Sequence, residues 1–271
     1  MKRRASPLKH WFCLVALSPL AVLVACYTVP QTGRSAFNVM SPQEELRLGK
    51  STFAEIKKKE KESKDERQIA MIQRVGKRIA TVADQDIPNA QWEFVLFESK
   101  EPNAFALPGG KVGVYTGILP ITQDDSGMAA VMGHEIAHAA ARHGSERFSH
   151  QLTMAGLATG LGIGLSEEDR STQELALLSF GLVTTLGHLL PHSRTQESEA
   201  DRIGLIYMAK AGYPPKAAVE FWQRFMDYNQ KQGGKPPAFL STHPADAKRI
   251  ADLEALLPEA EVYYKTSRKK S

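Results

Sequence analysis

The sequence predicts an α+β fold that is predominantly helical, with a small β-sheet beside one buried helix. Apolar residues recur at helical spacing over much of the chain, for example at Ile69, Ile72, Val75 and Ile79. Strand-like composition is concentrated between residues 92 and 119. With 42% hydrophobic and 24% charged residues, the chain can form a sizeable core. Its 271 residues suit one large domain, or one domain with appendages.

The N-terminal residues 1–25 resemble a lipoprotein signal peptide. A basic start precedes an apolar run too short to span a bilayer comfortably, and Leu23–Cys26 resembles the lipobox of bacterial lipoproteins. We expect cleavage before Cys26 and lipidation of its sulfur; an uncleaved anchor and a soluble secreted protein are the alternatives. Cys13 would leave with the signal, so no internal disulfide is expected. Tyr27, in place of Asp, resembles lipoproteins sent to the outer membrane.

The rest of the chain divides into a tether, a domain and a tail. Residues 26–40 are polar, with Pro and Gly and no apolar period, which indicates a lipid-anchored tether. Ser41 and Glu44 form a capping-box pattern with a proline between them, so we expect the domain to begin there. It should extend to residue 265, and residues 266–271 form a basic tail.

Two strands are predicted before the most informative helix. Trp92–Phe97 is rich in aromatic residues and Val, and a second strand is expected over Lys111–Leu119. The turn Pro108–Gly110 makes a hairpin-like element the expected connection.

His134, Glu135 and His138 form an H-E-x-x-H motif in a proline-free run that favours a helix. The two histidines are four residues apart, so both imidazoles can reach one metal ion. Glu135 can reach a water on that metal and act as general base. The alternative is a helix with two ordinary histidines and a solvated glutamate. The apolar flanks argue against it, because buried His and Glu need partners.

A third metal ligand must come from elsewhere. The metzincin extension is excluded because Ala141 and Gly144 stand where Gly and His are required. Glu197, with Asp201 one turn further on, fits the zincins that take a ligand glutamate from a downstream helix, and Asp201 could accept a ring N–H of a ligand histidine. Glu199 is the competing candidate, but it lies on nearly the opposite helix face. Two histidines and one glutamate leave an open position, typical of catalytic zinc; manganese or cobalt could substitute.

In a zincin, the strand Lys111–Leu119 is expected at the sheet edge beside the H-E-x-x-H helix. An extended polypeptide could add to such an edge through backbone hydrogen bonds. We therefore take Asn103, Gly113 and Val114 as candidate substrate-binding residues. A hairpin with only a structural role is the alternative.

Two apolar stretches, 152–165 and 175–190, follow the metal-binding motif. The first is short for a membrane span and the second contains His188. We predict buried or membrane-leaning helices, which could also form a lid over the site.

Four segments together resemble the HtpX-like and CAAX prenyl-protease-like zinc metallopeptidases, in particular their periplasmic lipoprotein members. They are Asn103–Gly110, Gly133–His138, Ser193–Asp201 and Ser241–Pro244. The resemblance covers residues 41 to about 258. It implies a mostly helical gluzincin fold with a small sheet, one zinc per chain, and endopeptidase activity on misfolded or unassembled envelope proteins.

The same resemblance implies a role for His243 near the zinc. There it would stabilise the transition state, or occupy the fourth position and keep the enzyme inactive; ordinary helix capping is the alternative. Arg194 would order the acidic cluster or help the oxyanion. His192 stands where relatives often carry an aromatic residue, so it receives no role. The remaining histidines have no metal-binding context: His143, His150 and His188.

The expected function is therefore a zinc endopeptidase on the periplasmic side of a bacterial envelope, anchored through Cys26 and acting on polypeptides. The net charge of +4 gives no case for nucleic-acid binding. A largely latent, zinc-bound scaffold that assists outer-membrane protein assembly is the main alternative. Glu135 favours the enzyme, because a scaffold does not need a base. A hydrolase of non-peptide substrates is a third reading.

Overall fold

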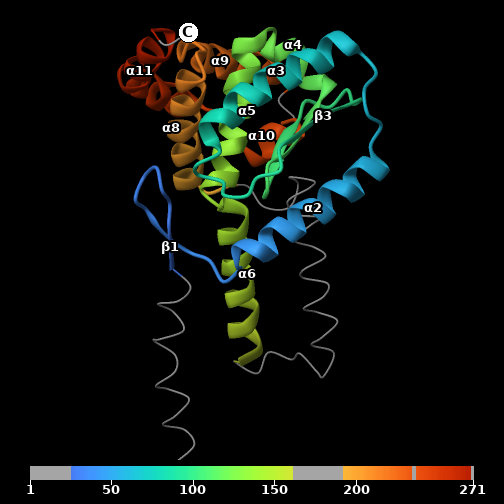
Figure 1. Ribbon diagram of the computed structural model, residues 1–271, viewed down its shortest axis with the longest axis vertical. Helices are drawn as coiled ribbons and strands as arrows, with labels where there is room; N and C mark the ends of the chain where they lie inside the picture. The colour runs from blue at the N-terminus through green and yellow to red at the C-terminus, as the bar shows by residue number, and fades with distance from the viewer. Residues whose placement is uncertain (1–25, 161–191, 234–235, 270–271) are drawn as a thin grey trace, which may run out of the picture.

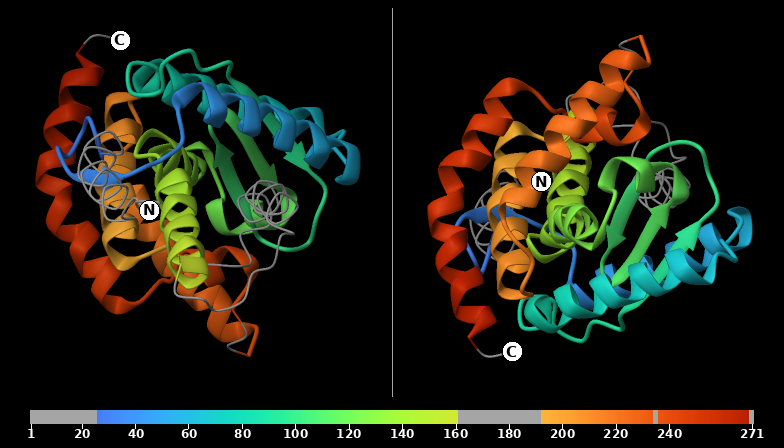
Figure 2. Two further views of the ribbon diagram at one scale, coloured as in Figure 1. Left: turned by 90° about the horizontal axis from the view of Figure 1, so that it is seen from below. Right: turned by 90° about the horizontal axis from the view of Figure 1, so that it is seen from above.

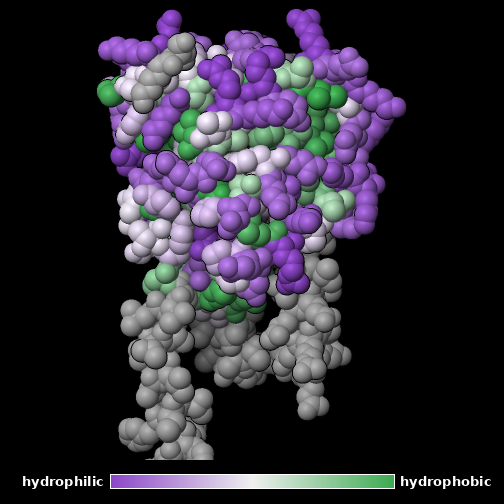
Figure 3. Space-filling view, in the orientation of Figure 1, coloured by the Kyte–Doolittle hydropathy of each residue, from purple (hydrophilic) through white to green (hydrophobic). Residues whose placement is uncertain are grey.

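The computed structural model describes residues 26–160, 192–233 and 236–269, with side chains described outside 154–160. The expected signal peptide and most of the two apolar stretches lie outside the described residues. Within the described part, no helix combines the length and apolar character needed to cross a membrane. The face seen in Figure 3 is mostly hydrophilic.

The architecture confirms the predicted α+β fold, with helices around small sheets. The strands are β1 (Cys26–Thr28), β2 (Ser35–Phe37), β3 (Glu93–Phe97), β4 (Ala104–Leu107) and β5 (Lys111–Tyr115). The α-helices of the described residues are α2 (Pro42–Lys59), α3 (Glu66–Ala83), α4 (Leu119–Thr122), α5 (Asp125–Ala140), α6 (His143–Gly160), α8 (Arg194–Lys210), α9 (Lys216–Lys231), α10 (Ala238–Thr242) and α11 (Ala247–Arg268).

Helix α5 lies at the centre of the domain (Figures 1 and 2). It packs on α8 on one side and on strand β4 on the other, and α11 covers the outer side of α8. Helix α3 packs on both α5 and β3. Nearly all of α5 is buried, which explains its continuous apolar sequence and weak amphipathic pattern.

The larger sheet has the order β3-β5-β4, with β3 and β5 parallel and β4 and β5 antiparallel. The expectation that Lys111–Leu119 is an edge strand is wrong: this strand ends at Tyr115 and lies in the centre. Gly109 and Gly110 take positive φ angles of 81° and 79°, which turn the chain back into a hairpin with β4. The edge position beside α5 belongs to β4.

The central position of β5 also argues against substrate binding by Gly113 and Val114. Both are buried, and their backbone lies between two neighbouring strands, so no substrate strand can add there. The ring of Phe105 fills the space above Gly113, where an added Cβ would lie 2.3 Å from Phe105 Cζ.

Residues 26–40, expected to be a tether, form a hairpin of β1 and β2 that packs onto the domain. Val29 and Ala36 are buried, which a solvated tether would not allow. The Tyr27 hydroxyl donates a hydrogen bond to the carbonyl of Ala140 at the end of α5. The tether expectation is therefore wrong for this segment.

The last helix, α11, begins after its cap, Asp246, whose carboxylate accepts a hydrogen bond from the Arg249 N–H. It continues to Arg268, so part of the expected tail is helical.

Helices α5 and α8 touch through two glycines. A Cβ on Gly204 would lie 2.8 Å from the carbonyl carbon of Gly133, and one on Gly133 would lie 2.8 Å from the Gly204 oxygen. Only glycine at both positions allows the two backbones to approach so closely. Gly133 directly precedes His134, so this contact sets the distance between the two helices at the candidate site.

Candidate metal centre

The H-E-x-x-H motif lies on α5, a buried helix with a capped N-terminus. The Asp124 carboxylate accepts hydrogen bonds from the N–H groups of Ser126 and Gly127, both at 2.9 Å, and so caps its N-terminus. His134 and His138 are buried and lie one turn apart, with their Nε2 atoms 3.1 Å from each other.

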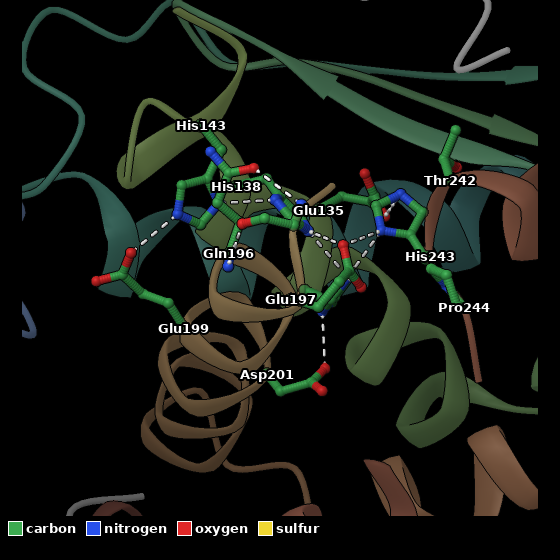
Figure 4. Close-up of polar contacts among 12 residues, drawn as sticks. Glu135, His138, His143, Gln196, Glu197, Glu199, Asp201, Thr242, His243 and Pro244 are labelled. Atoms are coloured by element: carbon green, nitrogen blue, oxygen red, sulfur yellow. Dashed lines mark hydrogen bonds and ion pairs between the residues drawn. The ribbon is translucent and has the colours of Figure 1, made fainter. Parts of the chain in front are cut away.

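Glu197 of α8 and His243, which follows α10, complete a group of four. The Nε2 atoms of His134 and His138 lie 3.4 and 3.2 Å from the Glu197 carboxylate oxygens. His243 Nδ1 lies 2.9 Å from Glu197 Oε1. One ligand atom from each of the four residues lies within 4.8 Å of all the others (Figure 4). The structure therefore brings together the three predicted ligands and His243.

This donor set fits a metal ion. Glu135 Oε1 and Glu197 Oε2 are buried and accept no hydrogen bond from the described residues, although Arg249 Nη1 lies 2.9 Å from the latter. Burial raises the pKa of Glu135. Burial opposes ionisation of Glu197 as well, but His243 and His134 hold its pKa well below the usual range. Buried carboxylate oxygens that face imidazole nitrogens are the donor set that a metal cation requires.

Asp201 lies behind His134, as the sequence predicted. Its Oδ1 is 3.0 Å from His134 Nδ1, which leaves Nε2 facing the other three residues of the group. Burial alone would lower the pKa of His134, but the adjacent carboxylates of Asp201 and Glu197 raise it to about 9.

The arginine that orders the acidic residues is Arg249 and not Arg194. Arg194 is exposed and forms no ion pair with the described residues. Arg249 is buried, forms hydrogen bonds of 2.8 and 2.7 Å with Asp201, and stacks on the ring of Trp222 at 3.6 Å. Forty-eight residues separate it from Asp201, so no local pattern in the sequence pointed to it.

His143 has a partner on each side, which the sequence did not suggest. Its Nδ1 lies 2.8 Å from Nδ1 of His138, and its Nε2 lies 3.0 Å from Glu199 Oε2. Glu199 faces away from Glu197, as the helix geometry predicted (Figure 4). Burial lowers the pKa of His143, against the effect of Glu199. His143 lies outside the group of four, although with His138 and His192 it forms a second, overlapping group.

The remaining histidines differ in their surroundings. The His192 ring lies tilted against that of His138, with centroids 3.9 Å apart, and stacks on that of His243 at 5.1 Å. His150 is exposed, and its ring lies 5.8 Å from that of Phe37. His188 lies outside the described residues.

A pocket adjoins the group of four, and His138 and His243 form part of its wall. Its walls also include Asn103 and Ala106 of the β4 region, Glu135 of α5 and Arg147 of α6. Burial lowers the pKa of Arg147 to about 10. Gly113 and Val114 are not part of the pocket wall. Strand β4 and Glu135 therefore line the same pocket.

A helical domain with two histidines and a glutamate on one buried helix, and a further glutamate on a second, defines a zincin-like metallopeptidase. The chain belongs to peptidase family M48, whose model matches residues 66–257. It is similar to mitochondrial metalloendopeptidase OMA1 of Schizosaccharomyces pombe, at 38% identity over 88% of this chain and 68% of that protein. It is also similar to the putative beta-barrel assembly-enhancing protease of Vibrio cholerae and the beta-barrel assembly-enhancing protease of Escherichia coli.

Both bacterial relatives are 28% identical to this chain, over 91% of it for Vibrio cholerae and 83% for Escherichia coli. The chain spans 51% and 46% of their respective lengths. The comparisons confirm the predicted metallopeptidase.

Proposed function

We propose that this protein is a zinc-dependent endopeptidase of the bacterial cell envelope that cleaves misfolded or unassembled envelope proteins. The buried Glu135, with Oε1 free of hydrogen bonds from the described residues and 3.4 Å from His243 Nε2, carries the catalytic part of this proposal. The resemblance of Leu23–Cys26 to a lipobox and the similarity to two bacterial proteases named for β-barrel assembly support the location. The similarity to a mitochondrial enzyme does not, so the location rests mainly on the N-terminal segment.

His134, His138 and Glu197 would hold one zinc ion per chain. When bound, zinc acts as a Lewis acid that acidifies water and polarises a carbonyl. Glu135 accepts the proton of the attacking water as a C–O bond forms, and delivers a proton to the amine nitrogen as the C–N bond breaks. Its raised pKa suits a carboxyl group that must both take and release a proton. Asp201 keeps the ring of His134 oriented through Nδ1.

An extended polypeptide would bind along β4. Tyr115 N–H donates to the Asn103 carbonyl, so alternation along the strand directs the backbone groups of Ala104 and Ala106 outward, away from β5. The Asn103 side chain accepts a hydrogen bond from the Ala104 N–H and can exchange it for a substrate amide. This assigns to Ala104 and Ala106 the strand-pairing role first expected of Gly113 and Val114, and keeps Asn103.

His243 would hold the resting enzyme in a latent state. Its Nδ1 lies 3.1 Å from His134 Nε2 and 2.9 Å from Glu197 Oε1, so it points at the position that a metal ion would take. A fourth protein ligand there competes with water, and a structural site is the result. Withdrawal of His243 would then open the site.

The same closed arrangement favours a second candidate, a zinc-bound scaffold that assists outer-membrane protein assembly. Glu135→Gln separates the two functions, because a scaffold keeps its effect without the base. Full rescue of an envelope assembly defect by Glu135→Gln would support the scaffold; loss of rescue supports the peptidase.

The direct experiment measures zinc content and casein cleavage of the full-length protein in detergent, for the wild type, Glu135→Gln and His243→Ala. We expect one zinc per chain in all three, cleavage at least 100-fold lower in Glu135→Gln, and faster cleavage in His243→Ala. Loss of cleavage in His243→Ala would make it a catalytic residue and contradict latency. Absence of zinc after repletion would overturn the ligand assignment.

A further inference from the structure

A second histidine and a carboxylate stand behind the metal-facing ring of His138. His138 points Nε2 towards His134 and Glu197 and Nδ1 towards His143. His143 is fully buried, and its other nitrogen meets Glu199 at 3.0 Å. Each of the two α5 histidines is thus backed by a carboxylate of α8: Asp201 directly for His134, and Glu199 through His143 for His138.

The Glu199 carboxylate determines which atom donates in each hydrogen bond of the series Glu199–His143–His138. An ionised carboxylate only accepts hydrogen bonds, so His143 Nε2 must carry the proton that it donates to Glu199. In neutral His143 the Nδ1 atom is then an acceptor, and His138 Nδ1 donates to it. His138 Nε2 then carries no proton, and its lone pair is directed at the other three residues of the group. This tautomer of histidine is the one that binds a metal ion through Nε2.

The turn between α5 and α6 is built to bring His143 to this place. Arg142 has a φ of 57°, a left-handed conformation that is uncommon for residues other than glycine. Its guanidinium is held by Glu45 at 2.7 to 3.0 Å, by the Met40 carbonyl and by the ring of Tyr27. Such strained residues are retained where their surroundings hold them, often at functional sites.

The N-terminal hairpin anchors the outer end of the series. The guanidinium of Arg34, in the turn between β1 and β2, donates from Nε to Glu199 Oε2 at 2.6 Å and from Nη1 and Nη2 to Glu146 at 2.7 and 2.9 Å. The Thr32 hydroxyl donates to the other oxygen of Glu199. Glu199 is 165 residues from Arg34 along the chain, so this contact is a product of the fold.

We propose that Glu199, His143 and Arg34 are positioning residues for the metal ligand His138, and that the N-terminal hairpin is therefore a structural part of the metal site. The hairpin begins at Cys26, so the segment nearest the expected lipid anchor contributes to holding the ion. This inference rests on metal binding by the site, but not on peptidase activity.

The test measures the zinc dissociation constant of the full-length protein by chelator competition. Glu199→Gln should weaken zinc binding about 10- to 100-fold, because partners behind a ligand histidine have effects of this size. Arg34→Ala should weaken it by a smaller factor, since Thr32 and His143 still hold Glu199. In the double variant, Arg34→Ala should add less than it does alone, because it acts through Glu199.

Arg202→Ala is the matched control. Arg202 also lies on α8 and makes a two-point ion pair, with Glu259 of α11, but it touches none of these residues. Thermal unfolding of each zinc-free variant reports the purely structural effect.

A zinc affinity in Glu199→Gln equal to that of Arg202→Ala would overturn the inference, as would additive effects in the double variant. A wild type that binds no zinc would instead overturn the proposed function, so the two failures are distinguishable.

Discussion

Arg249 and Asp201 meet through two parallel hydrogen bonds, from Nε at 2.8 Å and from Nη2 at 2.7 Å, although both side chains are buried. A third nitrogen, Nη1, lies 2.9 Å from Glu197. One guanidinium therefore neutralises both carboxylates on the inner face of α8, and burial, which opposes its charge, is outweighed by Asp201 and Glu197, which raise its pKa.

Replacing Arg249 by Leu should destabilise the zinc-free protein by about 3–5 kcal/mol, because two buried carboxylates lose their partner. Arg249→Lys should recover only part of this, since an ammonium cannot reproduce the two-point contact. Urea unfolding measures both changes. The control is Lys248→Ala, at an adjacent and exposed position, which should change stability by less than about 0.5 kcal/mol. Equal effects of Arg249→Leu and Lys248→Ala would contradict this account.

Adding a methyl group between α5 and α8 should disturb the metal site from a distance. Gly204→Ala places a Cβ 2.8 Å from the Gly133 backbone, so we expect a loss of about 1–3 kcal/mol in stability together with weaker zinc binding. Ser198→Ala, at an exposed position of the same helix, should do neither. Unchanged zinc affinity in Gly204→Ala would show that the helix spacing does not control the ligands.

The N-terminal cap of α5, the helix with the H-E-x-x-H motif, offers a milder perturbation. Asp124→Ala removes the acceptor for two N–H groups and should cost about 0.5–2 kcal/mol of stability. Asp124→Asn keeps an acceptor oxygen and should remain close to the wild type. Thermal unfolding distinguishes them, and equal losses in the two variants would assign the effect to charge.

Acid should destabilise the zinc-free protein partly through the residues paired with Arg34. Burial tends to raise the pKa values of Glu199 and Glu146. Hydrogen bonds from His143, Thr32 and Arg34 nevertheless hold the pKa of Glu199 at about 2. Hydrogen bonds from Arg34 and Gln196 lower the pKa of Glu146. Acids with depressed pKa values stabilise the fold above their unfolded-state pKa, and this stability is lost as the pH falls from about 5 towards 2.

The comparison with Arg34→Ala isolates this contribution. Without Arg34 the folded-state pKa values of Glu146 and Glu199 should rise, so stability should depend less steeply on pH in this range. The free energy of unfolding, measured from pH 3 to 6 for both proteins, tests it. Identical slopes would mean that Arg34 does not stabilise the ionised carboxylates.

The predictable part of the site is the part encoded by helical spacing. His134, His138 and the pair Glu197 and Asp201 lie at intervals of four, and a helix places such residues on one face whatever surrounds it. The fold class followed similarly from apolar periodicity. Arg249 did not, because it reaches Asp201 from a helix 48 positions later, and its partners are defined only by packing.

The strand order was unpredictable for a related reason. β4 has only four residues and follows Pro102 and Asn103, so its composition resembles a loop. Whether Lys111–Tyr115 is central or at the edge depends on which neighbours pair with it, and not on its own alternation. The hairpin of β1 and β2 likewise resembles a tether in sequence, because its strands have three residues each and their contacts are distant in sequence.

The contact between Gly133 and Gly204 has a consequence for how the holoprotein matures. Since no side chain separates α5 from α8 at Gly133 and Gly204, the spacing between His134 and Glu197 is determined as soon as the two helices dock. A metal ion would then bind to a site that already has its final dimensions, in contrast to small domains that fold only around their zinc. We therefore expect the zinc-free protein to fold first and to bind its metal afterwards.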